Sequence, residues 1–249
     1  MKSKENFEVK KNSGSGVKAI GKQGENPILP TDFINISKRI EHDSFQDWID
    51  TTSGQWFQYL VQNCDSINQK NIVYLDCEFN CKKGLLTPIL VCWEETKPPT
   101  GEESFGHAWG GKAQRRKLLE VLDRADLIVA YNLFSFDMCA LSYWGYDVES
   151  NIYKMVDPYH FFFRYTSFRR TASLGKVSAL NCGPEQIDID DVDASERKKA
   201  KCKNDVELLR HVFEAMMTGN VNTSRFGAIK TERRCYGSDQ LSSLFIEVV

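Results

Sequence analysis

Short apolar runs alternate with helix-like stretches along the middle of the chain. Residues 71–80, NIVYLDCEFN, open with β-branched, aromatic and aliphatic side chains in succession, which predicts a strand buried on both faces. Turn residues bound two further stretches, and we expect 88–93 and 104–109 to extend the first strand into an antiparallel meander. Residues 126–131, DLIVAY, form another continuous apolar run, which is typical of a strand in a parallel sheet.

Apolar residues at helical spacing lie around these strands. They predict helices over 112–125 and 194–218, and Gly219 follows the last turn of the second helix. Residues 31–70 show similar spacing, so we expect a helical preface that packs on the main domain. The alternation of strands and helices over 71–219 indicates one α/β domain.

The two ends of the chain carry weaker patterns. Residues 1–30 are rich in Lys, Ser and Gly for most of their length and have no hydrophobic periodicity, which predicts a mobile N-terminal tail. Residues 220–249 form a C-terminal extension, with candidate strands over 224–235 and 244–249.

Composition narrows the class of protein. A chain of 249 residues that is 41% hydrophobic can bury one sizeable core. The net charge of −2 means that any contact with nucleic acid must come from a local basic patch. The eight cysteines are scattered and no export signal precedes them, so we expect a cytoplasmic protein with buried thiols. No apolar run is long enough to cross a bilayer, so we expect no membrane role.

Two acids stand at the end of the first predicted strand. Side chains alternate along a strand, so Asp76 and Glu78 project from the same face while Cys77 projects from the other. Unpaired acids beside a buried strand cost several kcal/mol of desolvation unless a cation or hydrogen bonds compensate them. A divalent metal ion would supply that compensation. The alternative is a strand end at which both acids meet water.

Asp137 follows the predicted strand 126–131 in the sequence NLFSFD and opens an apolar helix. One interpretation is an exposed acid in the first helical turn, where the positive end of the helix dipole favours an anion. The other is that the turn brings Asp137 to the top of the sheet, opposite Asp76 and Glu78, because parallel α/β folds gather their chemistry at the carboxyl ends of strands. This segment alone does not separate the two.

Asp205 is the clearest physical anomaly of the sequence. Four apolar residues of the helix 194–218 fall within roughly 60° of it around the helix axis, so Asp205 lies on the buried stripe; they are Leu208, Leu209, Val212 and Met216. A carboxylate in such a place needs a partner. Glu207, in contrast, fits the ordinary solvent-facing side of the helix.

Three motifs resemble, in order and spacing, those of the DEDD exonuclease superfamily. They are D-x-E (Asp76, Glu78), N-x-x-x-F-D (Asn132, Phe136, Asp137) and C-x-x-D-V-x-L-L (Cys202, Asp205, Val206, Leu208, Leu209). The likeness spans about residues 71–219 and is similar to the proofreading exonuclease domain of family B DNA polymerases and its stand-alone relatives. It implies an RNase H-like fold, in which helices flank a mixed five-stranded sheet.

The resemblance also implies a chemistry. The acids Asp76, Glu78, Asp137 and Asp205 would hold two Mg²⁺ or Mn²⁺ ions about 4 Å apart, one activating water and the other stabilising the departing 3' oxygen. The expected activity is metal-dependent 3'-5' exonuclease hydrolysis of single-stranded nucleic acid, DNA rather than RNA, by in-line attack of water. The expected partners are therefore single-stranded DNA or RNA 3' ends.

The sequence departs from the family at one catalytic position. Relatives carry a Tyr four residues before the last Asp, or a His five before it, and here those positions hold Lys201 and Ala200. Lys201 lies one helical turn from Asp205 on the same face, and neighbouring carboxylates should raise its pKa, which makes it a poor general base. It could orient water or neutralise phosphate charge. Alternatively, it pairs with Asp205 and leaves a weak or inactive enzyme.

Substrate contacts are expected from aromatic and basic residues near the motifs. Phe79 follows Glu78 directly and could stack on the terminal base, and Asn132 and Phe136 belong to the second motif. Residues 159–176 mix rings with basic residues, a composition that suits a single strand, and we expect substrate contacts from Arg164, Arg169 and Arg170. The alternative is that these rings are core and the arginines a solvated face.

Three other functions remain open from the sequence. The first is a catalytically weakened nucleic-acid-binding module on the same fold, the second an RNA exonuclease, and the third an endonuclease of the same broad fold. The presence of all four acids favours an enzyme over the binding module.

Overall fold

The computed structural model of the protein describes residue 47 and residues 52–82, 85–134, 136–165, 172–181, 183–184, 193–223 and 228–230. Five strands form the main sheet, in the spatial order β3-β2-β1-β4-β5. They are β1 (Ile72–Lys82), β2 (Leu85–Glu95), β3 (Phe105–Ala108), β4 (Leu127–Val129) and β5 (Met155–Val156). Strands β1, β2 and β3 pair antiparallel, whereas β4 and β5 join β1 in parallel. The predicted mixed five-stranded sheet of an RNase H-like fold is confirmed.

Strand β1 is central because its apolar residues serve both faces of the sheet. Ile72 and Tyr74 belong to one buried cluster, and Val73 and Leu75 belong to the other. This is the reason for the unbroken apolar run in the sequence. The residues that follow this run lie in the middle of β1, which continues to Lys82.

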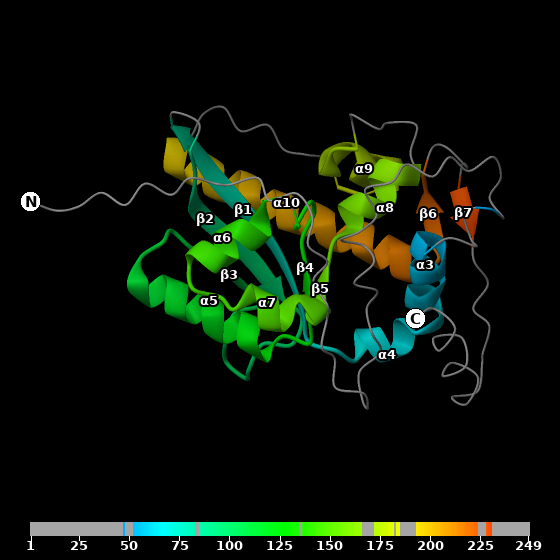
Figure 1. The fold of residues 1–249 in the computed structure, drawn as a ribbon, viewed down its shortest axis with the longest axis horizontal. Coiled ribbons are helices and arrows are strands. Elements are labelled where there is room, and N and C mark those ends of the chain that lie inside the picture. Colours follow the sequence, from blue (N-terminus) through cyan, green and yellow to red (C-terminus); the bar gives the residue numbers. More distant parts are fainter. Residues whose placement is uncertain are drawn as a thin grey trace, which may run out of the picture.

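The helices divide between the two faces. Helix α5 (Lys112–Arg124) and helix α6 (Asp137–Tyr143) pack on the face that carries Val73 and Leu75. The other face is covered by α3 (Thr52–Gln62) and the long helix α10 (Ala194–Met217). Figure 1 shows α10, in yellow to orange, running along the length of the molecule.

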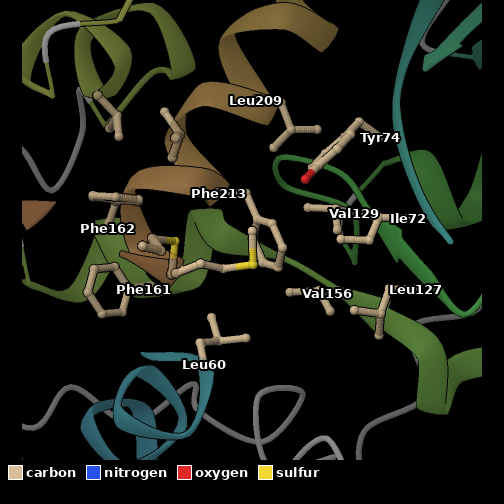
Figure 2. Close-up of a cluster of buried hydrophobic side chains, with 14 of the residues drawn as sticks. Leu60, Ile72, Tyr74, Leu127, Val129, Val156, Phe161, Phe162, Leu209 and Phe213 are labelled. Carbon is tan, nitrogen blue, oxygen red and sulfur yellow. The ribbon is translucent and has the colours of Figure 1, made fainter. Parts of the chain in front are cut away.

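Shorter helices complete the described part of the chain. They are α4 (Cys64–Asn68), α7 (Val148–Asn151), the 3-10 helix η1 (Ile152–Lys154), α8 (Pro158–Tyr165) and α9 (Leu174–Leu180). Figure 2 shows how Leu60 of α3, Phe161 of α8 and Phe213 of α10 meet in the larger core cluster. The N-terminal preface is helical where it is described, and its predicted apolar residues before residue 47 lie outside the described part of the chain.

Two short strands, β6 (Asn220–Asn222) and β7 (Ala228–Lys230), pair antiparallel in a second sheet. Only the β7 part of the candidate strand 224–235 is described, and the candidate strand 244–249 lies outside the described residues. Strand β5 was not expected as a strand, because two residues are too few for a periodicity to be recognised. No helix in the described ranges has both the length and the apolar character that a bilayer crossing requires.

Candidate metal centre

The candidate centre lies where α10 packs on β1. Asp76 and Glu78 are half-buried on the α10 side of β1, and Cys77 between them belongs to the opposite core cluster. The register of β1 and β2 shifts between Glu78 and Phe79, which marks a bulge directly after the acids. Such irregularities re-aim side chains at functional sites.

Asp205 completes a group of three acids. It is 7% exposed and comes from the buried stripe of α10, as its helical position predicted. One carboxylate oxygen from each of Asp76, Glu78 and Asp205 lies within 4.8 Å of the others. The structure therefore brings together acids that are more than a hundred residues apart in the chain.

The donor atoms of this group suit a hard divalent cation. All three residues offer carboxylate oxygens, which are the ligands that Mg²⁺ and Mn²⁺ prefer. The Oδ1 atom of Asp205 is buried and has no hydrogen-bond partner among the described residues. A buried acceptor without a partner costs about 1–3 kcal/mol, and a cation at this group could compensate that cost.

Lys201 contacts two of the three acids. Its ammonium is hydrogen-bonded to Oε1 of Glu78 and is 3.2 Å from Oδ2 of Asp205. Burial lowers the pKa of Lys201, but the hydrogen bond to Glu78 and the charge of Asp205 outweigh it, so the pKa lies above its usual value. Lys201 is therefore a cation at neutral pH and a poor proton acceptor, as predicted from its position.

Burial and mutual repulsion also shift the pKa values of the acids. Burial, followed by the charge of Asp205, raises the pKa of Asp76 to about 7. Burial raises the pKa of Asp205 as well, although Lys201 acts in the opposite direction. Burial is the largest cause of both shifts, and a bound cation would lower the pKa of both carboxylates.

Asp137 occupies the first turn of α6 and is 4% exposed, so the interpretation as an exposed helix-start acid is wrong. Burial, followed by the charge of Asp76, raises its pKa well above the usual value. Its charge contributes to the raised pKa of Cys77, and its carboxylate is not one of the three that lie within 4.8 Å. Asp137 thus lies near Asp76, in the helix that packs on the Cys77 face of β1.

Two cysteines lie beside the acids. Burial, followed by the charge of Asp137, raises the pKa of Cys77, and the thiol of Cys202 donates to the backbone oxygen of Asp76 at 3.3 Å. Both thiols are buried, as expected for structural cysteines. Strand alternation was the available signal for Cys77, because it predicts that this side chain faces the helix that Asp137 opens.

The turn between β4 and α6 is held by Asp157. The backbone N–H of Asn132 donates to Asp157 Oδ1 at 2.8 Å, and that of Phe134 donates to Oδ2 at 3.2 Å. Asn132 adopts a φ of 66°, a left-handed conformation that Asn tolerates better than most residues. Its Oδ1 atom is buried and unpartnered within the described residues.

Phe79, which follows Glu78 in β1, and Phe136 lie edge to face. Their ring centroids are 6.3 Å apart with an interplanar angle of 61°. Phe136 is 43% exposed, which makes it one of the few large apolar side chains open to solvent in the described structure. This pair belongs to two different motifs and is brought together only by the fold.

The predicted basic surface cannot be placed. Arg164 lies in α8, but its side chain is outside the description, and Arg169 and Arg170 lie outside the described residues altogether.

No protein-family model and no curated protein matches the chain. Among solved structures, it is similar to a family B DNA polymerase from the hyperthermophilic archaeon Pyrobaculum calidifontis, with a TM-score of 0.43 and 12% sequence identity. The alignment covers 68% of this chain and 31% of the polymerase chain, so the chain corresponds to less than two thirds of that protein. The fold assignment given above rests on the strand order of the sheet.

Proposed function

We propose that this protein is a metal-dependent 3'-5' exonuclease that acts on the free end of a single strand of nucleic acid. The observation that carries the proposal is the group of three carboxylates from β1 and α10 within 4.8 Å of one another. Hydrolysis of a phosphodiester needs stabilisation of negative charge on the phosphate and an oriented water molecule. A cluster of carboxylate oxygens can bind a divalent cation, and that cation can stabilise the negative charge and orient the water molecule.

Asp76, Glu78 and Asp205 are the residues that would hold Mg²⁺ or Mn²⁺. When bound, the metal supplies Lewis-acid activation of water and stabilises the departing 3' oxygen. Asp137 adds a buried carboxylate near Asp76, whose charge contributes to the raised pKa of Asp137. Lys201 contributes a permanent positive charge toward the scissile phosphate.

The aromatic pair Phe79 and Phe136 suits the terminal base of the strand. Phe136 presents an exposed ring against Phe79, which follows Glu78 in β1. Base stacking on such a ring tolerates any base sequence. A nuclease that shortens a strand step by step needs that tolerance, because each new terminal base differs from the last.

A direct test uses a single-stranded oligonucleotide labelled at its 5' end, with Mn²⁺ present. We expect a ladder of products that shorten from the 3' end, and no products when the 3' end is blocked. Asp76→Asn should abolish the ladder, whereas Glu149→Gln, which changes an exposed acid on α7, should not. Cleavage that ignores the blocked end would instead identify an endonuclease. Parallel DNA and RNA substrates decide the sugar preference.

A second candidate function is a nucleic-acid-binding module without catalysis. The observation that favours it is the engagement of Lys201 with both Glu78 and Asp205. This reading predicts retention of the oligonucleotide in a binding assay together with no shortening at any Mn²⁺ concentration. That result would overturn the exonuclease proposal.

A further inference from the structure

Lys201 stands in a position that a cation would otherwise take. Its ammonium bridges Glu78 and Asp205, two members of the acid group, and both contacts come from side chains on different elements of the fold. An ammonium and a divalent ion compete for the same carboxylate oxygens, since each of them is a cation surrounded by oxygen acceptors. The two contacts therefore remove Glu78 Oε1 and Asp205 Oδ2 from the set of free metal ligands.

Two ligand groups are not contacted by Lys201. Asp205 uses Oδ2 for Lys201, and its Oδ1 is buried without a partner among the described residues. Asp76 is part of the same group and makes no ion pair with Lys201 among the described contacts. The Asp76 carboxylate and Oδ1 of Asp205 are therefore the groups that remain to hold a divalent ion.

The charges of the group also favour one divalent ion. The group holds three carboxylates, and one divalent ion together with one ammonium balances them. A second divalent ion beside Lys201 would place five positive charges against three clustered carboxylates. Asp137 is not counted, because the group of carboxylate oxygens that lie within 4.8 Å of one another comes from Asp76, Glu78 and Asp205.

We infer that the centre takes a single divalent ion, held by Asp76 and Asp205, and that the ammonium of Lys201 fills the second cation position. The inference rests on the proposed function and refines it, since the resemblance implies two ions. Lys201 is then a fixed counter-ion that neutralises one carboxylate pair before any metal binds. It also explains how a lysine can stand at this position without acting as a base.

The number of bound ions tests the inference directly. Equilibrium dialysis with Mn²⁺ alone should give one ion per chain for the wild type. Lys201→Met removes the ammonium while keeping an unbranched side chain, so it should bind two ions per chain. Lys201→Arg keeps the positive charge and should bind one. Lys203→Met changes an exposed lysine of the same helix, which pairs with Glu207 at 4.0 Å, and should also bind one.

The inference is overturned if the wild type binds two ions, or if Lys201→Met still binds one. Circular dichroism checks that each variant folds, and Lys201→Gln replaces Lys201→Met if the latter does not. These outcomes are separate from the fate of the proposed function. A wild type that shortens oligonucleotides with two bound ions keeps the exonuclease and loses this inference. A wild type that binds one ion and shortens no strand keeps the inference and loses the exonuclease.

Discussion

Asp205 places a carboxylate on the apolar side of a helix, and this makes it the most informative single residue of the chain. It is 7% exposed, and one of its oxygens has no partner in the described structure. Under the proposed function, a bound cation would compensate the cost of burying that oxygen. The sequence predicted this residue correctly because α10 is long and regular.

Asp205→Asn should therefore separate stability from metal binding. The variant loses a charged ligand but relieves repulsion with Asp76, so we expect unchanged or higher melting temperature without metal. Wild-type protein should gain about 2.7 kcal/mol at a Mn²⁺ concentration one hundred times its dissociation constant, and the variant should gain far less. Differential scanning fluorimetry with Mn²⁺ and with EDTA measures both. An equal Mn²⁺ response in the two proteins would contradict the metal assignment.

Phe136 offers a second test on a single side chain. Its exposed ring lies against Phe79, so under the proposed function Phe136→Ala should weaken binding of a single strand by about 1–3 kcal/mol, the usual contribution of one stacked base. The substitution should change kcat less than it changes KM. Tyr153→Ala removes another exposed ring, outside the centre, and serves as the control. Fluorescence anisotropy of a labelled oligonucleotide in EDTA gives the affinities.

At the level of elements, an ion pair between Glu95 and Arg124 joins β2 to α5. Glu95 is 1% exposed and accepts two hydrogen bonds from Arg124, at 2.8 and 2.6 Å, and one from Asn71 at 2.7 Å. The contact joins the end of β2, the last turn of α5 and the residue before β1. It thereby holds the strand that carries Asp76 and Glu78 in its register.

Arg124→Met should leave the Glu95 carboxylate buried without its main partner. We expect a loss of about 3–5 kcal/mol in the free energy of unfolding, measured with urea. The double variant Glu95→Gln and Arg124→Met removes both charges and should recover part of the loss. A single variant that unfolds at the wild-type urea concentration would show that the pair contributes nothing.

The same pair predicts an acid limit. Burial raises the pKa of Glu95, but its hydrogen bonds from Arg124 and Asn71 outweigh this, and the pKa lies below its usual value. A lowered folded-state pKa means that the stabilisation is present above the unfolded pKa, about 4.3, and is lost as the pH falls through the folded value. Glu95→Gln should flatten this acid limb of the pH–stability profile.

For the whole molecule, the acid centre links folding to pH and to metal. Burial, then Asp205, raises the pKa of Asp76 to about 7, and that of Asp137 is also raised. Raised folded-state values mean that the folded protein binds more protons than the unfolded chain between about pH 4 and 7. Without metal, stability should therefore fall as the pH rises through this window, by about 1.4 kcal/mol per pH unit for each proton involved.

A bound cation replaces these protons, so the fall should be smaller in Mn²⁺ than in EDTA. Urea unfolding at pH 5, 6, 7 and 8 in both conditions measures the difference. Asp76→Asn removes one of the titrating groups and should reduce the fall in EDTA. Parallel profiles in Mn²⁺ and EDTA would contradict a metal centre at these acids.

The sequence by itself determined the main elements and three of the acids. An unbroken apolar run defined β1, helical spacing defined α10, and both placed their acids on the correct faces because each periodicity is local. It also predicted the mixed sheet, through the resemblance of three motifs.

Only the tertiary structure decided what those acids meet. The ammonium of Lys201 bridges Glu78 and Asp205, Asp137 lies close enough to Cys77 for its charge to raise the pKa of that thiol, and the ring of Phe79 packs against that of Phe136. Each contact joins residues from different elements, and its geometry depends on how α10 and α6 pack on the two faces of β1. Periodicity states which face of an element a residue occupies. It does not state which side chain of another element lies opposite, because that depends on packing over the whole core.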